Sequence, residues 1–302
     1  IGYGNGYEVS YMNSGKMTNK GWEFRVDAVP FENRDWRVGF YFNIAHNENK
    51  ITEMPDNYTE ENYTFNNGEY AYRREEGRPM GSFYGYRYKG VCQNKDATYA
   101  RDADGNVMKD ISGNAIVMRN GTATIAPGDA LYEDINHDGV INQYDIVYLG
   151  NSNPRFTGGA GVNVSYKQFK LSAIFYGRYG QDVVNSTRLN NESMRGIDNQ
   201  STAVLRRWRN EGDQTDIPRA LYGEGYNTLG SDRFVEDASY LRLKSLSFNY
   251  RLPKKIIQRW GFSNIDVYVT GYNLFTWTKY TGQDPEVKTE NTYARDSATT
   301  PA

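Results

Sequence analysis

Six long segments of this chain alternate apolar and polar side chains with a period of two, which is the pattern of β-strands that have two different faces. In the first segment, Trp22 and Phe24 share one face, while Glu23 and Arg25 share the other. At about ten or more residues each, the segments exceed the five or six residues that are usual for strands. The predicted strands are 21–30, 36–48, 155–166, 169–180, 239–252 and 264–276.

The connections between these strands alternate between short and long. The short ones are 31–35, 167–168 and 253–263, and the long ones are 49–154, 181–237 and the residues from 277 onward. Loops of such length are unusual inside a compact soluble domain. They are typical of outer-membrane barrels, in which short periplasmic turns alternate with long extracellular loops. Aromatic residues near the strand ends agree with the girdles of such barrels: Trp22, Trp36, Tyr166, Phe169, Tyr250 and Trp277.

Alternating strands also occur in soluble proteins, so the periodicity alone leaves open a large β-sandwich or another extracellular β-protein. The alternation of connection lengths favours an all-β fold, the antiparallel strands of a transmembrane β-barrel with long extracellular loops. The hydrophobic content of 38% is compatible with this fold because only alternate strand residues need to face lipid. We also expect one or two short helices, near 199–210 and 254–260, and a bulge near Lys244–Ser245, where the alternation changes phase.

Composition argues against several other classes of protein. The chain has 35 Lys and Arg against 37 Asp and Glu, so no excess of positive charge predicts nucleic-acid binding. The single cysteine, Cys92, excludes an internal disulfide framework and a cysteine-based zinc site, and two histidines leave little scope for metal or acid–base chemistry. No apolar run approaches the roughly 18 residues of a spanning helix. We expect neither an enzyme nor an organic cofactor.

The sharpest local motif lies between Asp134 and Asp145. Oxygen-bearing side chains occupy positions 1, 3, 5 and 12 of a twelve-residue loop, and Gly139 permits a sharp turn at position 6. This spacing wraps a loop around a hard cation such as Ca²⁺, although the acid at position 12 is Asp where Glu is usual. The alternative is a turn whose side chains bond their own backbone. The predicted ligands are Asp134, Asn136, Asp138, the carbonyl of Val140, and Asp145.

Further motifs occur in a fixed order along the whole chain. They lie at 13–23, 81–93, 127–129, 132–145, 149–159, 207–208, 218–219, 231–243, 250–253, 273–275 and 280–286. Taken together, they resemble the C-terminal barrel portion of SusC/RagA-like TonB-dependent outer-membrane transporters. The chain begins without a targeting signal and stops in a polar segment, so we expect it to be a piece of a longer polypeptide.

The resemblance implies a 22-stranded barrel with an N-terminal plug and a TonB box, neither of which is present in this chain. It implies location in the outer membrane of a Gram-negative bacterium, in contact with outer-membrane lipid. Family members import oligosaccharides, and sometimes peptides, with energy delivered through TonB, and a SusD-like lipoprotein caps them outside. The predicted structural Ca²⁺ in loop 134–145 would clip one long outer loop.

Two sets of side chains are candidates for contact with transported material. Tyrosine rings stack on sugar C–H faces and amides bond hydroxyls, which indicates Tyr58, Asn62, Tyr84 and Tyr86 in the long loops as substrate-binding residues. The alternative is that these side chains pack loop against loop. The polar strand face would line the lumen and contact the plug. Its residues are Glu23, Arg25, Asp27, Arg37, Tyr41, Asn43, Tyr176 and Arg178.

A second functional hypothesis is a soluble extracellular glycan-binding module, or a glycan-degrading enzyme, that carries the calcium loop. The 134–145 motif by itself is similar to one dockerin repeat, although no second full copy exists in the chain. The two hypotheses differ in what covers the apolar strand faces. A barrel leaves one continuous apolar band about 25 Å tall, whereas a soluble protein packs the same side chains against a second layer.

Overall fold

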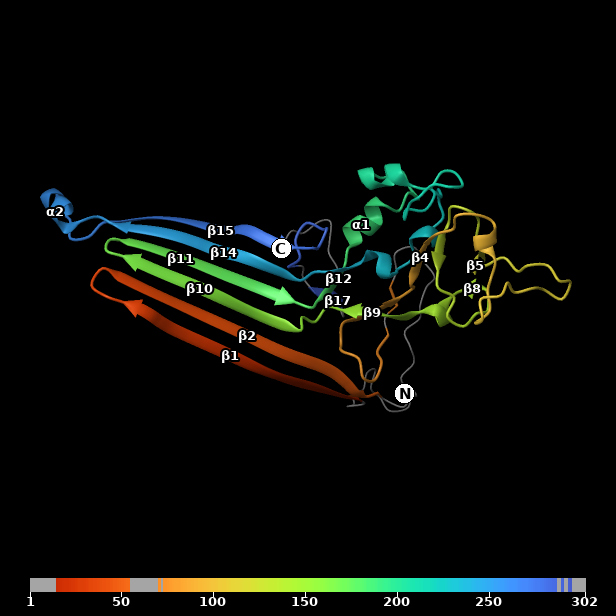
Figure 1. The fold of residues 1–302 in the computed structure, drawn as a ribbon, viewed down its shortest axis with the longest axis horizontal. Helices are drawn as coiled ribbons and strands as arrows, with labels where there is room; N and C mark the ends of the chain where they lie inside the picture. Colours follow the sequence, from red (N-terminus) through yellow and green to blue (C-terminus); the bar gives the residue numbers. More distant parts are fainter. Residues whose placement is uncertain (1–14, 55–69, 72, 287–288, 291–292, 295–302) are drawn as a thin grey trace, which may run out of the picture.

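The structure, a computed structural model, describes residues 15–54, 70–71, 73–286, 289–290 and 293–294. Figure 1 shows six long antiparallel strands side by side, with the long connections gathered at one end and the short turns at the other. Their order is β1-β2-β10-β11-β14-β15, so long strands that follow one another in the chain are neighbours in the sheet. Their bounds are β1 Lys16–Glu32, β2 Trp36–Glu53, β10 Phe156–Tyr166, β11 Phe169–Tyr179, β14 Tyr240–Arg251 and β15 Asp266–Thr278.

All six predicted strands are present, and β1 and β2 extend further than the alternation indicated. The predicted bulge is confirmed, because Lys244 has no partner on either neighbouring strand. The helix expected near 254–260 is confirmed as α2 (Lys254–Ile257) followed by the 3₁₀ turn η7 (Gln258–Trp260). The helix expected near 199–210 is wrong: the chain forms only the short 3₁₀ turn η4 (Thr202–Arg206) and becomes extended at Arg207.

The short turns follow from local side-chain chemistry. Between β1 and β2, the side-chain oxygen of Asn33 accepts hydrogen bonds from the backbone N–H groups of Asp35 (2.9 Å) and Trp36 (2.8 Å), which closes the turn. Between β10 and β11 only two residues intervene, and Lys167 adopts the left-handed conformation (φ 50°) that such a tight turn requires. The turns therefore hold neighbouring strands in register.

The register separates the side chains of the sheet into an apolar face and a polar face. One row of paired residues on the apolar face joins Val26, Phe42, Ala160, Phe175, Leu243 and Phe275. The adjacent row, on the polar face, joins Arg25, Asn43, Gly159, Tyr176, Arg242 and Thr276. From Trp36 to His46 the pairing is continuous, which at about 3.4 Å per residue and a barrel-like tilt of about 40° gives a band about 25 Å tall.

Aromatic side chains cluster at both ends of this band. At the turn end, the rings of Trp36 and Tyr166 lie 4.3 Å apart, and those of Phe169 and Tyr250 lie 4.7 Å apart. Within the part of the chain that the structure describes, the sheets besides this one have two or three short strands each, and the apolar face stays exposed. Phe42 is 41% exposed and Val269 is 72% exposed. The soluble alternative, in which a second layer covers this face, is therefore not what the described residues form.

The buried core lies in the long connections, at the end of the sheet opposite the short turns; this end is called the outer end, and the long connections the outer region. The paired strands of the long connections are β3 (Ser82–Gly85) with β9 (Val147–Asn151), β4 (Tyr88–Val91) with β7 (Ala130–Tyr132), β12 (Asp182–Val184) with β13 (Val235–Asp237), β16 (Thr289–Glu290) with β17 (Tyr293–Ala294), and β5 (Arg119–Asn120) with both β6 (Ala123–Thr124) and β8 (Val140–Ile141).

Short helices connect the small strands of this outer region. They are the α-helix α1 (Ser186–Asn191), which the sequence pattern did not predict, and the 3₁₀ turns η2 (Asp96–Thr98), η3 (Gln143–Asp145), η5 (Tyr226–Thr228) and η6 (Asp232–Phe234). Among the described helices, none has the length and hydropathy needed to cross a bilayer. The long connections thus form a packed body at the outer end of the sheet.

Candidate functional site

The polar face of the sheet gathers the residues that the sequence marked as lumen-lining. Strand pairing puts Arg25, Asn43 and Tyr176 on one row, and Glu23 and Arg178 on the next row toward the outer end. The remaining predicted residues lie on rows nearer the turns. All eight therefore share one face: Glu23, Arg25, Asp27, Arg37, Tyr41, Asn43, Tyr176 and Arg178. That this face lines a passage stays a prediction.

A buried arginine ties the chain after β15 to the outer end of the polar face. Arg242 donates hydrogen bonds to Thr276 (3.0 Å), to the Glu286 carboxylate (2.9 Å) and to the Asp284 carboxylate (2.5 Å). Glu286 also lies 3.7 Å from the Lys244 ammonium. The sequence reasoning did not assign Arg242 a role, although it stands in one of the recognised motifs. The cluster holds segment 279–286 against the strands.

Tyrosine rings and cations alternate beside this cluster. The rings of Tyr176 and Tyr240 are 6.3 Å apart, and the guanidinium carbon of Arg242 lies 5.3 Å from the Tyr240 ring centre. Arg178 donates to the hydroxyl of Tyr176 at 3.2 Å. Such a surface offers ring faces and charge-assisted donors to a polar solute.

Nearer the turns, the polar face carries a hollow of about 470 Å³. It is lined by charged and amide side chains, among them Asp27, Arg37, Asn163 and Lys170. The ring of Tyr41 lies across Gly161, where a β-carbon would collide with it. Glycine at this position therefore leaves room for an aromatic ring against the strand beside the hollow.

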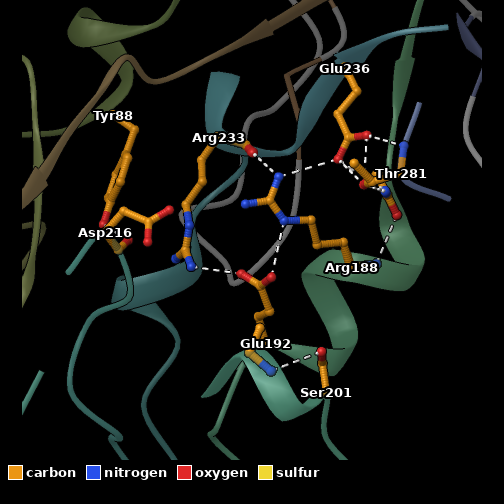
Figure 2. Close-up of polar contacts among 10 residues, drawn as sticks. Tyr88, Arg188, Glu192, Ser201, Asp216, Arg233, Glu236 and Thr281 are labelled. Atoms are coloured by element: carbon orange, nitrogen blue, oxygen red, sulfur yellow. Dashed lines mark hydrogen bonds and ion pairs between the residues drawn. The ribbon is translucent and has the colours of Figure 1, made fainter. Parts of the chain in front are cut away.

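A second charge network, shown in Figure 2, joins three distant segments of the outer region. Arg188 donates to the carboxylates of Glu192 (3.0 Å) and Glu236 (3.2 Å). Glu236 in turn accepts from the backbone N–H of Thr281 (2.9 Å), and Arg233 donates to Glu192 (2.7 Å). The network fastens α1 to the β13 segment and fastens that segment to the chain after β15.

The electrostatics of this network follow from burial and pairing. Burial raises the pKa of Glu236, but hydrogen bonds from Thr281, Arg188 and Asn185 outweigh it and hold the pKa of this carboxyl below its usual value. Burial lowers the pKa of Arg188, but the two glutamates outweigh it and raise that pKa overall. At neutral pH the charged forms are therefore the stable ones.

A third node fixes the loop after β6 to the segment around 219. The buried Asp129 carboxylate accepts two hydrogen bonds from Arg219 (2.7 and 3.2 Å) and one from the Asn227 amide (3.2 Å). Next to it, Gly128 has φ 92° and packs directly against the ring of Trp208. The sequence marked 127–129, 207–208 and 218–219 only as family motifs; their physical role is this packed node.

The loop with the calcium motif bonds its own backbone in this structure. Asp134 accepts from the N–H of Gly139 (2.8 Å), and Asp145 accepts from the N–H groups of Ile135 and Asn142 (both 2.8 Å). Within the described residues, no three His, Cys, Asp or Glu side chains group together as a metal site requires. Burial raises the pKa of Asp145, partly opposed by those N–H groups.

The loop is thus closed in the manner of the self-bonded alternative. The other predicted ligands take part in the same bonding: Asn136 donates to the Asp138 carboxylate at 2.9 Å, and the carbonyl of Val140 accepts from the Asn142 amide at 3.0 Å. Calcium binding stays a prediction.

The predicted substrate-binding tyrosines require a correction. Tyr84 and Tyr86 are fully buried in the core of the outer region, where Tyr86 packs against Tyr132 at 5.6 Å between ring centres. Every second residue from Tyr84 to Tyr88 points into this core, as the packing alternative stated. Neither Tyr84 nor Tyr86 is accessible to a substrate in this structure. Tyr58 and Asn62 lie outside the described residues.

Comparisons with known proteins agree with this geometry. The chain is 32% identical over 296 residues to TonB-dependent receptor P3 of Formosa agariphila, covering 95% of this chain and 27% of the receptor. It is 26% identical over 286 residues to TonB-dependent receptor SusC of Bacteroides thetaiotaomicron, covering 91% of this chain and 25% of that receptor. No protein-family model matches the chain.

A solved structure of the RagAB peptide importer in its closed-closed state superimposes with a TM-score of 0.66 and 25% identity, over 95% of this chain and 29% of that one. Sequence and fold together match this chain to the barrel portion of a SusC/RagA-like TonB-dependent transporter. The chain spans about a quarter of the length of these relatives.

The likeness to SusC/RagA-like transporters settles the fold class. The prediction of antiparallel barrel strands with long loops and few helices is confirmed, and the six described strands do not close into a barrel by themselves. The named relatives are receptors and importers. The position of this portion at the C-terminal end of a longer chain stays a prediction.

Proposed function

We propose that this chain forms part of the wall and outer loops of an outer-membrane transporter in a Gram-negative bacterium, which imports nutrients with energy delivered through TonB. The two-faced sheet carries this proposal. Its exposed apolar band suits hydrocarbon, and its polar face suits a hydrated passage and contact with a plug. A plug and a TonB box would be supplied by parts of the protein outside this chain. The likeness to TonB-dependent receptors supports the proposal.

The transported substrate in this proposal is an oligosaccharide or a peptide. Ring faces such as Tyr176 and donors such as Arg178 and Asn43 suit both, because aromatic faces stack on sugars and guanidinium groups bind peptide carboxylates. The RagAB neighbour is named a peptide importer, and SusC is named only a receptor. The polar face therefore supports the class of polar oligomers without choosing between its members.

The partner in this proposal is a SusD-like surface lipoprotein that covers the outer end. The outer region is built to present a defined rim: the Asp129 node, the network around Arg188 and the Arg242 cluster cross-link segments that are far apart in sequence. A rim held by buried ion pairs provides a fixed seat for a lid, whereas unconstrained loops would have to be ordered on docking.

The test uses the intact protein from which this chain comes. We expect it in the outer-membrane fraction, with the heat-dependent electrophoretic mobility of a folded barrel. Cells that express it should accumulate labelled oligosaccharide or labelled peptide only when TonB is present. Recovery in the soluble fraction, or uptake that is unchanged without TonB, would refute the proposal. Parallel assays with the two labels identify the substrate class, and co-purification identifies the lipoprotein.

A further inference from the structure

The turn between β14 and β15 differs from the other two short turns in its charge. Residues 253–263 carry Lys254, Lys255 and Arg259 and contain no acidic residue. These three cations make no ion pair with any residue that the structure describes, and all three are exposed. The turn therefore presents a net charge of three positive units to its surroundings.

The other two turns combine cations with acidic residues, and among the described contacts only Arg34 of the 31–35 turn has no ion pair. Lys167 lies 3.8 Å from the Asp35 carboxylate, and Arg37 lies 3.7 Å from Glu32. Arg251, just before the 253–263 turn, pairs with Asp266 at 2.9 Å. The 253–263 turn therefore carries the largest uncompensated charge at this end of the sheet, three cations without an acidic neighbour in the turn, against one in the 31–35 turn.

The same turn exposes large apolar side chains beside its cations. Trp260 is 60% exposed and Phe262 is 56% exposed, and Ile256 on α2 is exposed too, while Ile257 is fully buried and anchors the turn. Figure 1 shows α2 projecting beyond the ends of β14 and β15, at the end opposite the outer loops. Basic side chains beside a tryptophan and a phenylalanine form the combination that binds at a lipid headgroup layer.

We propose that the 253–263 turn is a lipid-binding anchor that holds anionic phospholipid headgroups of the periplasmic leaflet. Lys254, Lys255 and Arg259 bind the phosphate groups, and Trp260 and Phe262 insert at the boundary between headgroups and acyl chains. The turn is continuous with the aromatic end of the apolar face at Tyr250, so the bilayer that covers that face reaches the turn. The inference rests on the proposed function for its membrane orientation.

The test measures retention of phosphatidylglycerol and of phosphatidylcholine by the intact transporter, using native mass spectrometry. In the variant K254Q/K255Q/R259Q, the affinity for phosphatidylglycerol should fall by roughly fivefold for each cation removed. Phosphatidylcholine retention should not change. The matched control is K20Q/K95Q/K109Q, which removes three exposed lysines near the outer end of the strands and in the outer region. This control should retain phosphatidylglycerol as the unmodified protein does.

Equal phosphatidylglycerol retention by the turn variant and the unmodified protein would overturn the inference, as would an equal loss in the control. A second measurement uses vesicles that contain phosphatidylglycerol brominated near the headgroup. Quenching of tryptophan fluorescence should decrease in Trp260→Phe, and unchanged quenching would contradict insertion of Trp260. If the transporter inserts and shows heat-dependent mobility but fails these lipid tests, only the lipid-anchor inference is refuted. A protein recovered in the soluble fraction refutes the proposed function.

Discussion

A matched pair of substitutions measures which face of the sheet contacts lipid. Val162 and Ile174 are both β-branched, and they are 41% and 37% exposed, respectively. They stand on neighbouring strands in adjacent rows: Val162 pairs with Phe40 on the apolar face, and Ile174 pairs with Gly161 on the polar face. Both lie near the middle of the band between Trp36 and His46. The two positions therefore differ mainly in the direction of the side chain.

We expect Val162→Arg to destabilise the intact protein in a bilayer by about 2–4 kcal/mol, because a guanidinium near the midplane must be accommodated by hydrocarbon. A cost of about 3 kcal/mol corresponds to a shift on the order of 100-fold in the folding equilibrium. Ile174→Arg should cost about 0–1 kcal/mol, since its side chain enters a polar surface near Asp27 and Tyr41.

The assay is urea-dependent folding of the intact protein into phosphatidylcholine vesicles, followed by tryptophan fluorescence and electrophoretic mobility. The difference between the two arginine variants is the informative quantity, because both replace a β-branched residue with the same cation. Equal effects, or a larger cost for Ile174→Arg, would refute the assignment of the apolar face to lipid.

Three further predictions concern the outer region. Gly128→Ala should destabilise this region by roughly 2–4 kcal/mol, because the cost of a left-handed backbone adds to the collision of the new β-carbon with the Trp208 ring. Gly113 also has a positive φ but faces open space, so the control Gly113→Ala should cost about 1 kcal/mol. Thermal melts of the two variants measure the difference. Because the pKa of Glu236 is lowered in the folded protein, its contacts should be complete at neutral pH and weaken as the pH falls below about 4.3. Hydrogen exchange of the 279–286 segment, corrected for intrinsic rates, should show this loss. Glu236→Gln should remove the pH dependence. The calcium prediction requires heat in a calorimetric titration with millimolar Ca²⁺ that disappears in Asp134→Asn; no heat in the unmodified protein would contradict it.

The predictions that succeeded rest on local, repeating physics. A strand between lipid and a polar face must alternate with a period of two, so its position can be found from neighbours in the sequence. The bulge at Lys244 was visible for the same reason, because an extra residue shifts the phase of the alternation. The start of α2 could be predicted from Pro253, because proline is favoured at the beginning of a helix.

The errors arose where long-range packing decides the outcome. Tyr84 and Tyr86 look like surface aromatics in a polar loop. Tyr84 is buried because β3 pairs with β9, and Tyr86 is buried because the segment at 230–231 and Tyr132 of β7 pack against it. The helix expected at 199–210 gives way to an extended chain, in which the backbone N–H of Trp208 donates to the carbonyl of Ile217 and the Trp208 ring packs on Gly128. The helix propensity of one segment contains no information about such distant partners.

The sequence by itself determined the strands, their two faces and the family, because alternation and motif order are properties of neighbouring residues along the chain. Only the tertiary structure decided which charges meet. Asp129 finds Arg219, Arg188 lies between Glu192 and Glu236, and the chain after β15 returns to Arg242. These partners come from separate loops, and their pairing depends on how the loops pack at the outer end of the sheet.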